Sequence, residues 1–120
     1  MDISTKNIPG AVTPAVFHIL LSLLDGPKHG YAIMKEVDER TDGEVQLPPG
    51  TLYRSLQKMR RDGLVEMLDE PSTQGVHDTR RRSYRLRSQG IESARKEAER
   101  LDRLVAMARS KQLIPSQEPA

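Results

Sequence analysis

Apolar residues recur at helical spacing in two stretches near the start of the chain. Residues 15–24 are apolar on nearly all sides, which predicts a deeply buried helix. Thr13-Pro14 supplies an N-cap followed by proline at the first helical position. A second helix is predicted over residues 30–41, and Asp42-Gly43 ends it. Its inner face consists of Ile33, Met34 and Val37.

The third predicted helix, residues 49–62, has two contrasting faces. Pro48-Pro49 stops the preceding segment and suits a helix start, while Gly63 easily takes the left-handed conformation just past a helix end. The packing face, at i, i+4 and i+7, consists of Leu52, Leu56 and Met59. The opposite face consists of Thr51, Arg54, Lys58 and Arg61. Such a helix is suited to a DNA major groove, although a basic outer face is also common on a merely solvated helix.

The period changes from helical to alternating after Gly63. Residues 64–68 are short and apolar-rich, and residues 81–87 alternate in character, so both are predicted to be strands. The segment between them, 69–80, is too long for a tight hairpin turn. Two strands joined by a protruding loop after a basic helix predict a wing.

A long final helix is predicted from Ser88, as its cap, to about Lys111. Its apolar seam is spaced 3, 4, 3, 4, 3 and widened by Leu104, and we expect it to pair with a second copy of the chain rather than pack only within its own subunit. The buried first helix is expected to join this contact. The predicted dimer interface comprises Val16, Leu20, Leu24, Ile91, Ala94, Ala98, Leu101, Leu104, Val105 and Ala108.

These elements predict a mainly α fold with a small antiparallel β wing. We expect a flexible N-terminal arm (1–12), a winged helix-turn-helix domain (13–87), a C-terminal dimerisation helix (88–112) and a frayed tail (113–120). The length of 120 residues suits one domain with a modest core.

Charge is unevenly distributed along the chain. The formal net charge is +2, but residues 1–48 carry a net −3, residues 49–87 a net +4 and residues 88–120 a net +1. Cations concentrated in the middle block indicate a local footprint for a polyanion.

Composition argues against several other classes of function. No cysteine is present, and His18, His29 and His77 share no metal-ligand spacing, so we expect no metal, no cofactor and no catalysis. His18 is expected to be a satisfied core residue and His29 a cap or turn residue. The longest apolar run, 15–24, is too short to cross a bilayer, which favours a cytoplasmic protein without a membrane partner.

Several motifs resemble the PadR family of bacterial transcriptional regulators in the family's order. They are Ile19-Leu20-Leu21-Ser22-Leu23-Leu24, Gly26-Pro27-Lys28-His29-Gly30-Tyr31, Pro49-Gly50-Thr51-Leu52-Tyr53, Gly63-Leu64-Val65-Glu66 and Arg81-Arg82-Ser83-Tyr84-Arg85-Leu86 followed by Gly90. The resemblance implies a winged helix-turn-helix homodimer on palindromic double-stranded DNA, most often a repressor. It also implies a small-molecule effector, because some members release DNA when such a ligand binds.

The residues expected to contact DNA come from the third helix and the wing. Arg54, Lys58 and Arg61 suit phosphates or guanine edges, and Thr51 and Ser55 suit a phosphate near the helix start. Tyr53 either touches the DNA backbone or supports the helix against the second one, and Tyr31 is expected in the core or at a single backbone contact. In the wing the candidates are His77, Arg80 and Arg81. The alternative function is a protein–protein adaptor whose basic face meets an acidic partner.

Overall fold

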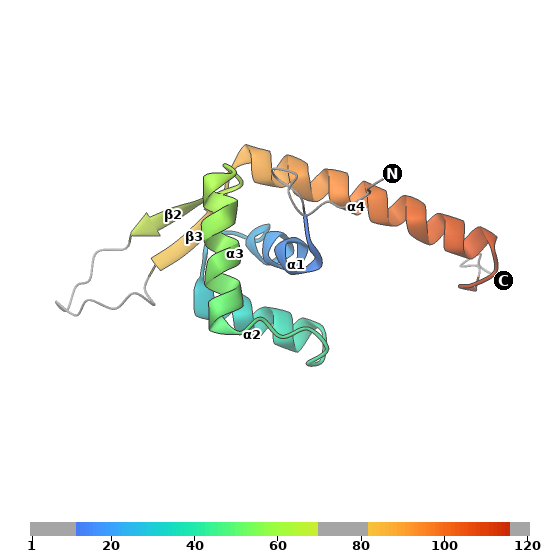
Figure 1. Cartoon of the computed structure of the whole chain (residues 1–120), viewed down its shortest axis with the longest axis horizontal. Helices are drawn as coiled ribbons and strands as arrows, with labels where there is room; N and C mark the ends of the chain where they lie inside the picture. Colours follow the sequence, from blue (N-terminus) through green and yellow to red (C-terminus); the bar gives the residue numbers. More distant parts are fainter. Residues whose placement is uncertain (1–11, 70–81, 116–120) are drawn as a thin grey trace, which may run out of the picture.

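Four helices and three short strands make up the described part of the chain (Figure 1). The computed structural model describes residues 12–69 and 82–115. The helices are α1 Pro14–Leu23, α2 Gly30–Arg40, α3 Pro49–Arg61 and α4 Ser88–Ser110, and the strands are β1 Lys28–His29, β2 Val65–Asp69 and β3 Arg82–Leu86. The predicted fold class, mainly α with a small antiparallel sheet and a long C-terminal helix, is confirmed. None of these helices is both long and apolar enough to span a membrane.

The ends of α1 and α3 follow from their capping residues. The Thr13 hydroxyl accepts a hydrogen bond from the Val16 N–H at 3.2 Å, and proline occupies the first turn of both helices. At the end of α3, Gly63 has φ +79° and the Leu64 N–H donates to the Met59 carbonyl at 2.9 Å, as in a Schellman motif. The predicted Ser88 cap is wrong, because Ser88 is already the first residue of α4 and the cap position belongs to Arg87, whose side chain makes no capping bond.

The sheet has one more strand than the two predicted. Its order is β1-β3-β2, both pairs are antiparallel, and β2 pairs with β3 from Val65 opposite Leu86 to Asp69 opposite Arg82. The extra strand, β1, is two residues long, which is too short to produce an alternating pattern. It ties the start of α2 to the base of the wing.

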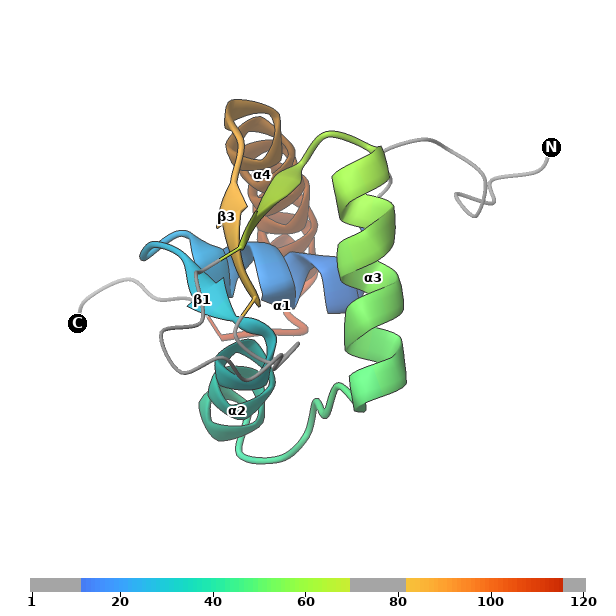
Figure 2. The ribbon, with the colours of Figure 1, turned by 90° about the vertical axis from the view of Figure 1, so that its left-hand side faces the viewer.

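Helix α1 lies at the centre of the domain and packs against α2, α3, α4 and β3 (Figure 2). Val16 and Leu20 are therefore only 7% and 0% exposed within their own chain. Their predicted place in a dimer interface is wrong for that reason, whereas Leu24 is 49% exposed. Val12, predicted to belong to a loose arm, is half-buried and packs against the same core.

Helix α4 extends away from the rest of the domain (Figure 1). Its 23 residues span about 35 Å at 1.5 Å per residue, and only Gly90 and Ala94 in its first turns are buried. Ala94 belongs to the core of its own chain rather than to an exposed seam, which corrects its predicted interface role.

Candidate nucleic-acid interface

Helix α3 presents its basic face to solvent. Leu52, Leu56 and Met59 are at most 1% exposed and anchor the helix to the core. On the opposite side Arg54, Lys58 and Arg61 are exposed, while Thr51 and Ser55 are half-buried at its edge. The five polar residues predicted from the sequence are thus brought together on one side of a helix that is fixed from behind.

Most of the cations on and beside this face lack carboxylate partners among the described residues. Within residues 12–69 and 82–115, the side chains of Arg54, Arg60 and Arg61 make no ion pair or hydrogen bond. Lys58 is the exception, with its Nζ 2.8 Å from the Asp62 Oδ2. A cation without a partner can bind an incoming anion without first losing an ion pair.

Elsewhere in the described ranges several cations are paired with carboxylates, whereas others, such as Lys96 and Arg103, are not. Arg40 pairs with Glu36 at 3.3 Å and Arg95 pairs with Glu92 at 2.7 Å. Arg100 binds Glu97 through two hydrogen bonds of 2.8 and 2.6 Å, and these bonds hold the pKa of the Glu97 carboxyl below its ordinary value. On α3, by contrast, three cations that are unpaired within the described residues, Arg54, Arg60 and Arg61, project from one helix.

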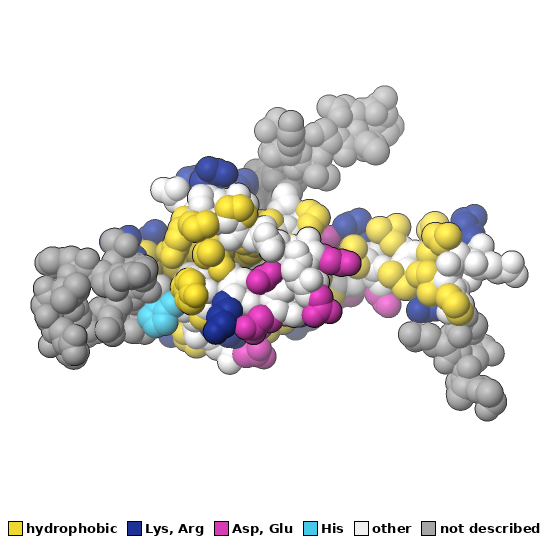
Figure 3. All heavy atoms as spheres, turned by 90° about the horizontal axis from the view of Figure 1, so that it is seen from below, with side chains coloured by type: hydrophobic (Ala, Val, Ile, Leu, Met, Phe, Trp, Pro, Cys, Tyr) yellow, Lys and Arg dark blue, Asp and Glu magenta, His cyan; other side chains and the backbone are white. Residues whose placement is uncertain are grey.

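The surface over α2 has the opposite sign. Figure 3, which looks at the molecule from below, shows Asp and Glu side chains gathered on this side. The exposed acids of α2 and the loop after it are Asp38, Glu39, Asp42 and Glu44. This asymmetry would orient the domain with α3 toward a polyanion.

The two tyrosines near α3 have different surroundings. The ring of Tyr53 lies on the start of α2, so closely that a Cβ added at Gly30 would stand 2.7 Å from the tyrosine hydroxyl oxygen. This contact matches the supporting role considered for Tyr53. Tyr31 is 64% exposed, so the core alternative is wrong and the single DNA-backbone contact stays a prediction.

His18 was expected in the core but is half-buried beside Arg40. Its Nδ1 lies 3.2 Å from the Arg40 Nη2, which also donates to the His18 backbone carbonyl at 3.0 Å. Burial, and then the charge of Arg40, lower the pKa of the imidazole from its ordinary value. His29 occupies the N-cap position of α2 without a side-chain capping bond. In the described ranges no three His, Cys, Asp or Glu side chains gather where they could hold a metal ion.

Other candidates lie outside the described residues or were missed. His77, Arg80 and Arg81 belong to segment 70–81, which lies outside the described ranges. Gln57 and Arg60 were missed, although both are exposed on α3. Their spacing was the available signal: Gln57 follows Arg54 by three residues and so shares its face, and Arg60 follows Gln57 by three.

Known proteins share both the sequence pattern and this fold. Residues 19–96 match the transcriptional regulator PadR-like family. The chain is 36% identical over 86 residues to an uncharacterised 37.1 kDa protein in transposon TN4556 of Streptomyces fradiae. The match covers 72% of this chain but only 22% of that protein.

Solved structures of transcriptional regulators superpose over most of the chain. A transcriptional regulator from Clostridium thermocellum has a TM-score of 0.69 at 24% identity, covering 91% of this chain and 97% of that one. A PadR family transcription regulator from Clostridium difficile has a TM-score of 0.63 at 27% identity, covering 80% and 97% of the two chains. With the family match extending over well over half of its residues, the chain belongs to the PadR-like family of transcriptional regulators.

Proposed function

We propose that the protein is a homodimeric repressor that binds a palindromic promoter site. Each subunit would insert α3 into one of two successive major grooves about one helical turn apart. The observation that carries this proposal is the exposed face of α3, where Arg54 and Arg61 have no partner in the described ranges while acidic side chains gather over α2. In this reading Thr51 and Ser55 contact phosphates near the helix start, and His77, Arg80 and Arg81 follow the backbone from the wing.

The uncovered apolar face of α4 supports dimerisation. Leu104 and Met107 are 47% and 55% exposed, and Ile91 and Val105 are also exposed. A helix that extends beyond its own domain with an apolar stripe in water is stabilised when a second copy covers that stripe. We propose that the interface consists of Leu24, Ile91, Ala98, Leu101, Leu104, Val105 and Ala108.

DNA binding is tested with duplexes from the region flanking the protein's own gene, chosen for an inverted repeat and titrated by fluorescence anisotropy. The affinity should fall steeply with salt, because several phosphates are neutralised per subunit. Arg54→Ala should weaken binding by about 1–3 kcal/mol if the side chain reads a base. Arg103→Ala, an exposed arginine on α4, is the matched control and should leave binding unchanged. Equal affinity for the repeat and for random duplex would favour the adaptor function instead.

Dimerisation is tested by placing a charge in the α4 stripe. Leu104→Glu should produce monomers in analytical ultracentrifugation, because two carboxylates would face each other across an apolar seam. Ala106→Glu adds the same charge two residues along, on a side of α4 away from the seam, and should leave the dimer intact. A wild-type protein that sediments as a single subunit at micromolar concentration would overturn the dimer.

The remaining parts of the proposal are regulatory. We propose that the protein acts in the cytoplasm and that a small apolar effector bound near the α4 contact releases it from DNA. Titrating phenolic compounds into the protein–duplex complex tests this, with release of labelled duplex as the expected result. A complex that persists through saturating ligand while the ligand demonstrably binds would refute effector release.

A further inference from the structure

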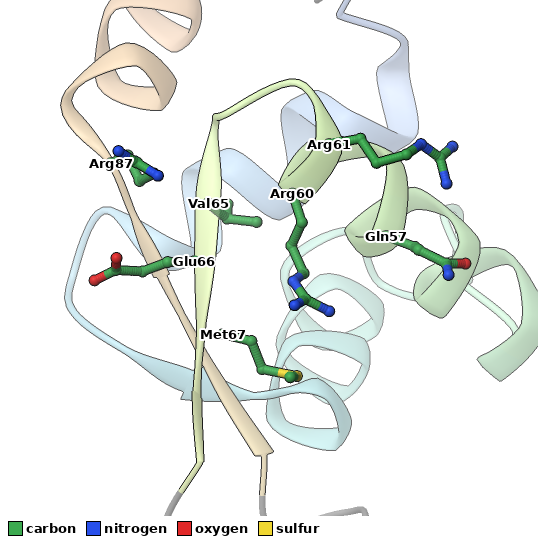
Figure 4. Close-up of a pocket in the computed structure, with 7 residues that line it drawn as sticks. All are labelled: Gln57, Arg60, Arg61, Val65, Glu66, Met67 and Arg87. Carbon is green, nitrogen blue, oxygen red and sulfur yellow. The ribbon is translucent and has the colours of Figure 1, made fainter.

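A cleft of about 490 Å³ lies between the C-terminal half of α3 and the start of the wing (Figure 4). Arg60 points from α3 into the space in front of β2, alongside Met67, whereas Arg61 points away on the far side of α3. Arg87, the residue after β3, completes the lining on the side of the sheet. Residues of α3 and β2, together with Arg87 from much later in the sequence, therefore line one open space.

The cleft carries an excess of positive charge. Arg60, Arg61 and Arg87 are exposed, and within the described residues none of them has an ion-pair or hydrogen-bond partner for its side chain. The acid in the lining, Glu66, is bound across the strands by Arg85. The carboxylate is therefore already engaged, and among the described residues the guanidinium groups of Arg60 and Arg87 remain at the cleft without a counter-charge.

Such an arrangement has a physical cost that a bound anion removes. Guanidinium groups that share a cleft repel one another, and the apolar floor formed by buried Val65 and half-buried Met67 screens them less than water does. Arginine binds phosphate oxygens through two parallel N–H bonds, which makes a phosphate the best-matched occupant. The cleft is open to solvent on its outer side, so a phosphate that belongs to a long nucleic-acid strand can enter it.

The position of the cleft relative to α3 indicates which part of a DNA duplex would reach it. An α-helix with its side chains is about 10–12 Å wide and nearly fills a major groove about 12 Å wide, so the two sugar-phosphate backbones run along its flanks. Arg60 lies on the flank that faces the wing rather than on the outermost face of α3. A side chain on that flank reaches backbone phosphates and not base edges.

We propose that this cleft binds the sugar-phosphate backbone of the DNA strand on the wing side, with Arg60 and Arg87 each binding a phosphate. The inference rests on the proposed DNA-binding function and adds two residues that the sequence did not single out. Because these contacts go to phosphates, they strengthen binding to any duplex equally and set the register of α3 rather than its choice of sequence.

The salt dependence of binding tests the proposal. Each phosphate contact contributes about 0.9 to the slope of log K against log salt, so Arg60→Ala/Arg87→Ala should lower the slope by about 1.8 per subunit and twice that per dimer. When the salt is raised from 50 to 200 mM, the affinity of the double variant should therefore fall about 12-fold less per subunit than that of the wild type. The ratio of affinities for the inverted repeat and for random duplex should not change. Arg103→Ala/Lys96→Ala, which removes two exposed cations of α4, is the matched control and should retain the full slope.

The outcomes separate this inference from the function on which it rests. If the wild-type protein fails to bind the repeat, the proposed function is wrong; if it binds and the double variant keeps the full slope, only the cleft is wrong. A double variant whose preference for the repeat collapses would also overturn the assignment, because Arg60 or Arg87 would then read bases. Calorimetric titration with inorganic phosphate tests whether the cleft binds free phosphate rather than the DNA backbone. Free phosphate would be the ligand if the wild type bound it saturably and the double variant did not, while the salt slope of DNA binding was the same for both proteins.

Discussion

Gly90 provides the sharpest test of the packing that sets the direction of α4. A Cβ added at this position would stand 2.2 Å from the Leu64 carbonyl oxygen and 3.2 Å from the Leu86 Cδ2. The first contact is about 0.8 Å shorter than the 3.0 Å that real Cβ atoms respect, and its partner is backbone that cannot rotate away. Gly90→Ala must therefore push α4 off the start of β2.

Two effects of opposite sign decide the magnitude. Replacing glycine by alanine inside a helix normally stabilises by about 1 kcal/mol. Against this, overpacking costs typically about 1–3 kcal/mol. Displacement would also strain the hydrogen bond from the Arg87 N–H to the Leu64 carbonyl, 2.9 Å long and worth about 1 kcal/mol. The net expectation is a destabilisation of about 2 kcal/mol, which for a chain of this length lowers Tm by roughly 8 °C.

The assay is thermal unfolding followed by circular dichroism, at one protein concentration for all variants because dimerisation would make Tm depend on concentration. Gly50→Ala is the matched control, since its Cβ would meet only the tip of the Arg54 side chain at 3.5 Å. It should raise Tm by a few degrees through helix propensity alone. A Gly90→Ala protein that is as stable as wild type or more so would refute the close approach of α4 to Leu64.

Three further predictions concern single side chains. The folded state lowers the pKa of His18, so the contribution of this residue to stability should be fully present above its ordinary pKa of 6.5 and be lost as the pH falls through the folded value. Urea titrations at pH 8 and 5.5 should show a smaller loss of stability at the lower pH for His18→Gln than for the wild type, and an equal loss in both proteins would contradict the prediction. Asp62→Asn should tighten DNA binding about two- to fivefold in anisotropy titrations, because Lys58 would no longer be paired with a carboxylate. An unchanged affinity would show that the ion pair does not compete with DNA for Lys58. Gly63→Ala should destabilise by about 1–2 kcal/mol in chemical denaturation because φ is +79°, and neutrality would show that the turn relaxes.

Local features of the sequence were sufficient to predict each helix and the two longer strands. Periods of 3.6 and 2 identify buried faces. Thr13 and Gly63 mark helix ends through hydrogen bonds made within a few residues of themselves, and Pro49 marks a helix start through its fixed φ. The cap at Ser88 was misplaced by one residue because a serine signals a helix start only approximately, and the neighbouring backbone decides which residue takes the extended conformation.

The polar face of α3 was also predictable, because residues three and four apart on a helix lie on the same side. Arg54, Lys58 and Arg61 needed no knowledge of the rest of the fold. Whether the side chain of each cation is paired was harder to predict from the sequence. Lys58 and Asp62 are four residues apart, so their ion pair could have been anticipated. That the Arg54 side chain has no partner within the described ranges depends on every element nearby.

Contacts between distant segments were decided only by the tertiary structure. The pattern of α1 showed that it was buried but not by what, and Val16 and Leu20 lie against their own chain because α1 is enclosed on several sides. The pairing of β1 with β3, and the cleft that joins Arg60 to Arg87, bring together segments well separated along the chain. Periodicity reports the direction in which a side chain points from its own element. Which partner stands in that direction depends on how all the elements pack at once.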